Sequence, residues 1–143
     1  MLQDGLFEMP TGLEIAPKML TVRQPWAWAI FHAGKDVENR TWYTGHRGPL
    51  LICAGRKADP RGYAFLEALG IKVPDLSDQM GVIAGLVQVE DCVEGSQSPW
   101  AFPEVWHWQL AGAQAATKRV ECVGSLGLPF APAGWREALD LAV

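Results

Sequence analysis

The sequence lacks the features that mark several large classes of protein. It has no apolar run near the ~18 residues that cross a bilayer, and positions 1–17 show neither a basic start nor an apolar block. Its three cysteines, Cys53, Cys92 and Cys122, are odd in number and far apart, so we expect reduced thiols, not a disulfide framework or a zinc knuckle. No set of His, Cys and Asp has the spacing of metal ligands. These absences favour a cytoplasmic protein without a membrane segment, and we expect no metal or other cofactor.

Basic residues are fewer than acidic residues, but most of them lie in one part of the chain. The chain has 12 Lys and Arg against 16 Asp and Glu, a net charge of −4. The segment from Lys18 to Arg61 nevertheless holds eight basic and three acidic residues, a local balance of +5 that leaves −9 for the rest. A basic segment in an acidic chain suits a focused site for an anionic ligand better than a broad surface for duplex DNA. The alternative is chance clustering on a solvated surface.

The length of 143 residues and the hydrophobic fraction of 49% predict one domain with a sizeable core. Positions 1–17 contain Pro and Gly without a sustained period and are expected to form an extended arm, so the domain covers 18–143. Helical patterns cover 25–33, 59–69 and the segment from about 134, and β-rich patterns cover 19–23, 37–43, 49–54, 81–89, 105–110 and 118–124. Strands outnumber helices and do not alternate with them regularly. This favours an α+β fold, a mostly antiparallel barrel with helices packed outside.

Polar and aromatic residues gather between Gln24 and Gly48. A cleft that recognises a nucleobase needs a flat ring for stacking, hydrogen-bonding groups for the base edge and cations for the phosphate, and this segment contains all three. Among the seven tryptophans, Trp26, Trp42 and Trp100 are candidates for a cleft wall. The structural alternative is that Glu and Arg pair only to hold a turn, and that the tryptophans fill the core.

Three motifs in this part of the chain resemble the ASCH domain family. They are Leu-Thr-Val-Arg-Gln-Pro-Trp-Ala from Leu20, Gly-Lys-x-x-Glu-x-Arg from Gly34, and Trp-Tyr-Thr-x-His-Arg-Gly from Trp42. The resemblance implies a PUA-like β-barrel with flanking helices and a cleft lined by the second motif. It also places the chain in a superfamily associated with RNA binding.

On this basis we expect the protein to bind RNA, another single-stranded nucleic acid, or a nucleoside or nucleotide in a small cleft. Basic side chains would contact the anionic groups, and Glu38 would contact a base edge or orient Arg40. The candidate binding residues are Arg23, Gln24, Trp26, Lys35, Glu38, Arg40, Trp42, Tyr43, His46 and Arg47.

The resemblance leaves two alternatives open. Some ASCH-like proteins remove the acetyl group of N4-acetylcytidine with a lysine, a threonine and a glutamate, and others are described as ribonucleases. Lys35 matches that lysine, but Glu38 occupies the threonine position and cannot act as a hydroxyl nucleophile. A hydrolase would use Lys35 and Glu38 as its catalytic residues, which requires Lys35 to lie on a turn or bulge, since residues three apart on a strand face opposite sides. The other alternative is an interaction module with a protein partner.

Overall fold

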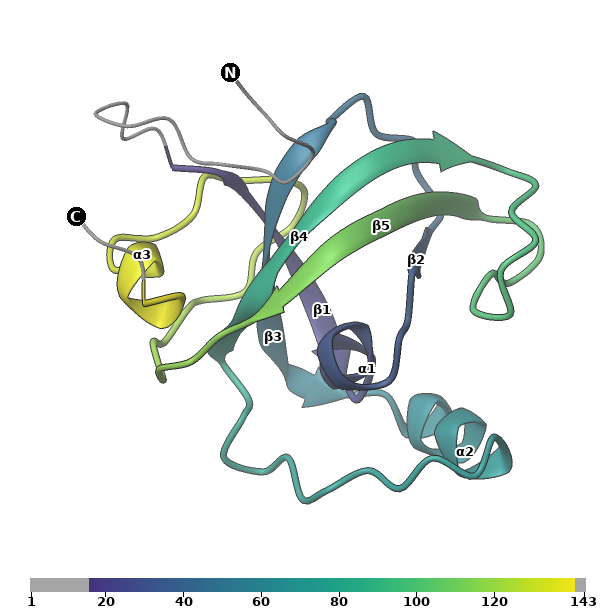
Figure 1. Cartoon of the computed structure of the whole chain (residues 1–143), viewed down its shortest axis with the longest axis horizontal. Coiled ribbons are helices and arrows are strands. Elements are labelled where there is room, and N and C mark those ends of the chain that lie inside the picture. Colours follow the sequence, from purple (N-terminus) through teal and green to yellow (C-terminus); the bar gives the residue numbers. More distant parts are fainter. Residues whose placement is uncertain (1–15, 141–143) are drawn as a thin grey trace.

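A computed structural model describes residues 16–140 and has the α+β architecture expected from the sequence (Figure 1). Its elements are β1 (Lys18–Gln24), α1 (Trp26–His32), β2 (Val37–Arg40), β3 (Gly48–Ala58), α2 (Pro60–Ala68), β4 (Val82–Val93), β5 (Trp106–Ala115) and α3 (Trp135–Ala138). The strands form one sheet in the order β1-β3-β4-β5-β2, with β1 parallel to β3 and the other pairs antiparallel. The sheet curls into a half-barrel, which confirms the PUA-like fold class. Most of the expected arm over 1–17 lies outside the described residues.

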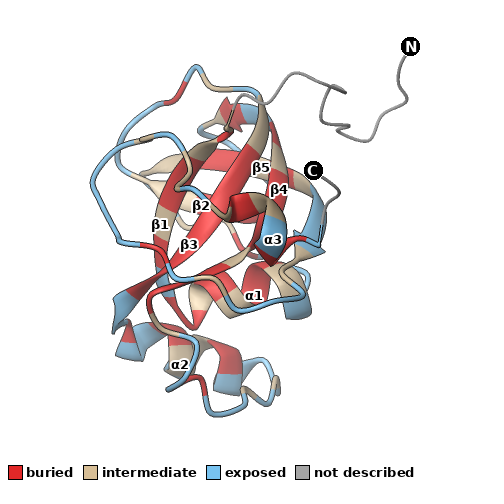
Figure 2. Ribbon diagram, turned by 90° about the vertical axis from the view of Figure 1, so that its left-hand side faces the viewer, coloured by how far each residue is buried: buried red, intermediate tan, exposed pale blue. Residues whose placement is uncertain are grey.

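The middle of the sheet forms from the most apolar segments of the chain. The run from Leu50 to Ala54 in β3 is completely buried (Figure 2). In the sheet, β3 lies between β1 and β4. The ladder between β3 and β4 shifts register next to Gly85, which pairs with Ile52.

Helix α1 covers the concave side of the sheet and contacts β1, β3, β4 and β5. Its alanines allow a close approach, and Ala27 and Ile30 join a core with Leu20, Ile52 and Trp108. Helix α2 packs outside α1 through Leu66, and its outer side is exposed (Figure 2). The two helices therefore close the concave side of the sheet.

The cysteine prediction is wrong for two of the three residues. Cys53 on β3 and Cys122 form a disulfide across 69 residues of sequence, with their Cα atoms 6.2 Å apart, and Cys92 is a buried free thiol. Spacing along the chain gave no sign of this pair, because only the fold brings the returning C-terminal segment beside β3. The bond lies in an outer apolar cluster that α3 covers with Trp135 and Ala138.

The strand expected over 118–124 is not formed either. Within this segment Glu121 makes an isolated bridge to Val82, while β5 continues beyond the pattern that ended at 110 and ends at Ala115. Most residues from 118 to 124 are exposed, so no apolar face holds them in a sheet. Cys122 is buried and ties this segment to the domain.

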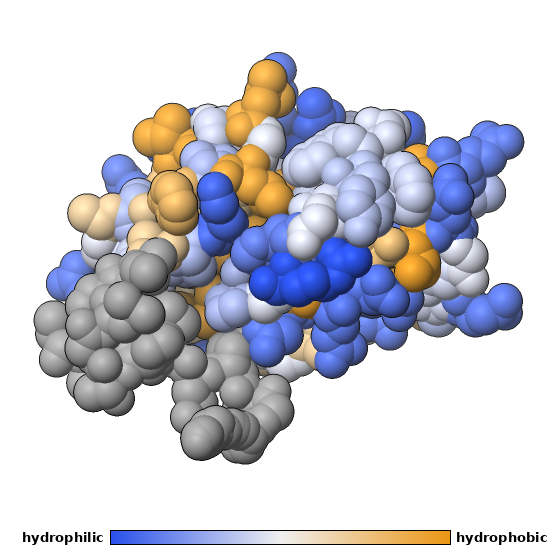
Figure 3. Space-filling model, turned by 90° about the horizontal axis from the view of Figure 1, so that it is seen from above, coloured by the Kyte–Doolittle hydropathy of each residue, from blue (hydrophilic) through white to orange (hydrophobic). Residues whose placement is uncertain are grey.

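The surface seen from above mixes hydrophobic and hydrophilic side chains (Figure 3). The large hydrophobic side chains that are exposed in the described residues are Trp42, Tyr43, Leu69, Val123, Leu126 and Phe130. None of the described helices is long and apolar enough to cross a membrane.

Candidate functional site

A cleft of about 850 Å³ opens beside the C-terminal half of β1 and the start of β2. This volume is in the range of small-molecule sites. Its walls come from parts of the chain that are far apart in sequence: Thr21, Val22, Arg23, Trp26, Lys35, Glu38, Asn39, Arg40, Thr41, Trp42, Asp59, Arg61, Phe65, Phe102, Ser125, Leu126 and Gly127. The second motif of the sequence thus lines a cleft, together with residues from α2 and two loops.

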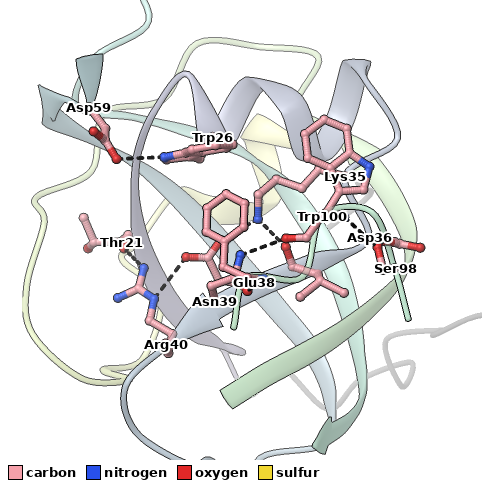
Figure 4. A network of polar contacts seen from close by, with 12 residues as sticks. Thr21, Trp26, Lys35, Asp36, Glu38, Asn39, Arg40, Asp59, Ser98 and Trp100 are labelled. Atoms are coloured by element: carbon pink, nitrogen blue, oxygen red, sulfur yellow. Dashed lines mark hydrogen bonds and ion pairs between the residues drawn. The ribbon is translucent and has the colours of Figure 1, made fainter. Parts of the chain in front are cut away.

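Three charged side chains, which we call the charged triad, meet on the inner wall (Figure 4). Glu38 lies between the other two: Lys35 Nζ is 3.0 Å from Glu38 Oε1, and Arg40 Nε is 3.0 Å from Glu38 Oε2. Lys35 also donates to the carbonyl oxygen of Val37, and Arg40 Nη2 donates to that of Thr21 at 2.7 Å. Each member is therefore held by more than one contact.

The local sequence explains why the triad converges. Gly34 adopts a φ of +74°, which suits glycine, and ends the helical segment. Lys35 then lies on the turn before β2, so its side chain meets Glu38 although the two are three residues apart. Arg40 follows Glu38 by two residues on the same strand face.

The triad is mostly removed from solvent. The side chains of Lys35, Glu38 and Arg40 are 3%, 9% and 24% exposed. Burial alone would raise the pKa of Glu38, but the charges of Lys35 and Arg40 and their hydrogen bonds outweigh it, so this pKa lies below its ordinary value of 4.5. Glu38 is thus an anion at neutral pH, and the triad carries a net charge of +1.

An aromatic wall stands beside the triad. The indole N–H of Trp26 donates to Asp59 Oδ2 at 2.9 Å, and the ring centroid lies 5.7 Å from Lys35 Nζ. Gly62 of α2 packs against the same ring so closely that a Cβ there would lie 2.9 Å from Trp26 Cε2. Phe65 and Phe102 contact it with centroid distances of 5.6 and 5.8 Å. These contacts hold the ring in one orientation.

Two arginines lie at the open side of the cleft. Arg23 is exposed, and Arg61 Nε pairs with Asp59 Oδ1 at 3.2 Å while 88% of its side chain is exposed. Four cations in the cleft, including Lys35 and Arg40, face two carboxylates, so the lining carries +2 in a chain of net −4. Anionic ligands are favoured here.

The structure brings six of the ten candidate binding residues to the cleft. These are Arg23, Trp26, Lys35, Glu38, Arg40 and Trp42. The remaining candidates, Gln24, Tyr43, His46 and Arg47, are not among its lining residues. Trp100, considered for a cleft wall, is buried outside the lining and contacts Phe65.

Each of those four residues has a different place. Gln24 is buried, and its Oε1 accepts from the backbone N–H of Trp28 at 2.8 Å, which supports the first turn of α1. Arg47 Nη2 contacts Tyr43 and lies 3.3 Å from Asp91 Oδ1. The backbone N–H of His46 donates to Thr44 Oγ1, and its ring Nε2 lies 2.8 Å from the carbonyl oxygen of Pro49 in β3. Apart from Trp42, the third motif therefore lies outside the cleft, between β2 and the start of β3.

Asp59, Arg61, Phe65 and Phe102 line the cleft and were not among the sequence candidates. Asp59 and Pro60 mark the start of α2 in the sequence. These residues reach the cleft only because β1 pairs in parallel with β3, with Gln24 opposite Ala58. This register places the start of α2 beside the start of α1. The pairing is a long-range property that no local pattern gives.

Residues 16–140 contain no group of three or more His, Cys, Asp or Glu side chains placed to hold a metal ion.

The sequence is similar to that of known proteins. Activating signal cointegrator 1 of Homo sapiens is 34% identical to the chain over 94 residues, 60% of this chain and 16% of the human protein. The protein of the same name from Mus musculus is 33% identical over the same shares. The chain thus corresponds to only a small part of these relatives. The ASCH domain family matches residues 20–122, which include the charged triad, and the chain belongs to this family.

Proposed function

We propose that the cleft binds one nucleotide of single-stranded RNA, with the base inside and the phosphate at the open arginines. The carrying observation is a cleft of about 850 Å³ that combines a fixed aromatic wall with a positive lining in an acidic protein. ASCH domains are generally RNA-binding, which supports this choice of ligand. Fold alone does not define function, so the argument rests on the site.

The parts of the cleft fit the parts of a nucleotide. Bases of single-stranded RNA stack on aromatic rings and are recognised on their exposed edges. Trp26 and Phe102 supply rings, the charged triad supplies donors and acceptors, and Arg23 and Arg61 supply cations for phosphate. The pairing of Arg61 with Asp59 leaves Arg23 as the open arginine best suited to a phosphate.

Fluorescence anisotropy of a short labelled single-stranded RNA, titrated at several salt concentrations, tests this function. We expect affinity to fall with salt, and Arg23→Ala to weaken binding and to reduce the slope of log K against log salt by about one. Lys72→Ala is the control, because it removes an exposed cation that does not line the cleft. An affinity that changes neither with salt concentration nor in Arg23→Ala would contradict the proposal.

A hydrolase acting on a modified nucleoside of the N4-acetylcytidine type, or a ribonuclease, is the second candidate. The contact of Lys35 with Glu38 in the cleft favours it, since an ammonium can polarise a carbonyl or stabilise a phosphate. The lowered pKa of Glu38 weighs against it, because a carboxylate stabilised by two cations is a weak general base. Product formation from acylated nucleosides or RNA that is lost in Lys35→Ala would establish this activity.

A protein partner is the third candidate, and the name of the relatives, a signal cointegrator, is compatible with it. Capture of a protein that competes with RNA for the cleft would favour it over the main proposal.

The cytoplasmic location expected from the sequence also stays a prediction.

A further inference from the structure

The charged triad alternates in hydrogen-bonding character along the inner wall of the cleft. The Lys35 ammonium donates, the Glu38 carboxylate accepts, and the Arg40 guanidinium donates. Lys35 uses two of its three N–H groups on Val37 and Glu38, and Arg40 uses two of five on Glu38 and Thr21. The carboxylate oxygens each accept one of these bonds and have room for another. Because all three side chains line the cleft, they present a donor–acceptor–donor row to a ligand bound there.

The triad is fixed in this order. Glu38 is held as an anion between two cations, so it cannot turn into a donor, and neither cation can turn into an acceptor. A wrong base turns a donor towards a cation or an acceptor towards the carboxylate, and the triad cannot adapt as an amide or hydroxyl could. Discrimination by such mismatches is stronger than discrimination by shape alone.

Of the four RNA bases, uracil has the complementary edge. Its O4 carbonyl, N3–H and O2 carbonyl present acceptor, donor and acceptor in that order. The pattern is symmetric, so either carbonyl can face Lys35 while N3–H faces Glu38. Guanine matches at O6 and N1–H, but its amino group meets a cation. Cytosine turns its N3 acceptor towards the carboxylate and its amino group towards a cation, and adenine presents an amino group and an acceptor in the same way.

We infer that the cleft selects bases with an intact imide edge, uracil above all, through the donor–acceptor–donor row of Lys35, Glu38 and Arg40. This inference rests on the proposed function and specifies its ligand. Uridine in RNA, free uridine monophosphate and thymine in single-stranded DNA share the imide chemistry. The expected order of affinity among RNA bases is uracil, then guanine, then cytosine and adenine.

The test compares labelled oligouridine, oligocytidine and oligoadenosine by fluorescence anisotropy with the wild-type protein. We expect oligouridine to bind about tenfold more tightly or better, since one well-formed base-edge pair discriminates by at least this order. Oligouridine made with 3-methyluridine, which lacks only the N3–H donor and carries a methyl group there, should lose this advantage. Competition by uridine monophosphate or oligothymidine, without competition by their cytosine counterparts, supports imide selection and identifies the source of the ligand.

A pair of variants assigns the selectivity to the triad. Glu38→Gln removes the anionic acceptor and should bring oligouridine and oligocytidine to similar affinities. Glu67→Gln makes the same chemical change on the exposed side of α2, outside the cleft, and should leave the ratio unchanged. If Glu38→Gln does not fold, the comparison of oligouridine with its 3-methyluridine form on the wild-type protein still shows whether the cleft recognises the N3–H group.

The outcomes separate this inference from the proposed function. Similar affinities for all homopolymers, or full binding of the 3-methyluridine oligomer, would overturn imide selection and leave RNA binding intact. Absence of binding to any of these RNAs would overturn the proposed function and the inference with it.

Discussion

Glu38 is the residue on which the electrostatics of the cleft depend. It is the single anion between Lys35 and Arg40, and all three side chains come from one short stretch of sequence. Period-two alternation predicted that Glu38 and Arg40 lie on one strand face. The contact of Lys35 with Glu38 was not predicted, because it depends on a turn after Gly34 that the sequence does not reveal. The contact of Trp26 with Asp59 was not predictable, because the two residues meet only through tertiary structure.

Replacement of Glu38 by Gln should lower the free energy of unfolding at neutral pH by about 3 kcal/mol, because it leaves the buried Lys35 and the partly buried Arg40 without their anion. The folded-state pKa of Glu38 lies below 4.5, so its stabilisation is complete above the unfolded-state pKa and is lost as the pH falls through the folded-state value. The difference between wild type and variant should therefore shrink below about pH 4.5.

Urea unfolding of both proteins at a series of pH values measures this difference. Glu67→Gln serves as the reference, because Glu67 is exposed on α2 and its replacement should change stability little at any pH. A stability difference for Glu38→Gln that stayed constant down to strongly acid pH would show that the carboxylate charge is not its source.

At the scale of elements, α2 owes its start to Asp59. This residue is the N-cap, with Oδ1 accepting from the backbone N–H of Arg61 at 3.1 Å, while Oδ2 accepts from Trp26. The helix patterns beginning at 25, 59 and about 134 were confirmed because caps, Pro and Gly are local signals. The pattern over 118–124 failed because this segment meets β4 only at the bridge between Glu121 and Val82, and most of its residues are exposed.

Asp59→Ala should destabilise the protein by about 1–2 kcal/mol, since it removes a helix cap and leaves a partly buried indole N–H without its acceptor. Arg61→Ala is the matched control, because it removes the exposed ion pair but keeps the backbone N–H that Asp59 caps. Thermal unfolding should separate the two variants clearly. Equal losses would mean that the ion pair, not the cap, carries the effect.

For the whole molecule, the fold class was predictable from the count and order of elements, whereas the closure of the domain was not. The disulfide between Cys53 and Cys122 joins parts of the chain 69 residues apart. Such a pair depends on the path of the chain between its ends. The same holds for Ser125, Leu126 and Gly127, which reach the cleft only after the chain returns past β1.

Loss of this disulfide should cost about 4 kcal/mol of unfolding free energy in the chain-entropy account of a loop this long. Unfolding by urea with and without dithiothreitol, and of Cys122→Ala, measures the loss. Cys92→Ala is a useful comparison, because that thiol is free and dithiothreitol should affect the variant as much as wild type. If dithiothreitol leaves the urea midpoint of unfolding unchanged, the disulfide does not contribute to stability.

The parallel pairing of β1 with β3 requires the chain to cross over between them, and α1 and β2 form this crossover. The charged triad, Trp26 and Trp42 all lie after β1 and before β3. The crossover therefore has two tasks: α1 and β2 complete the core and the sheet, and the same segment supplies the charged triad of the cleft. A substitution in this segment can therefore change both the stability of the domain and the ligand that the cleft accepts.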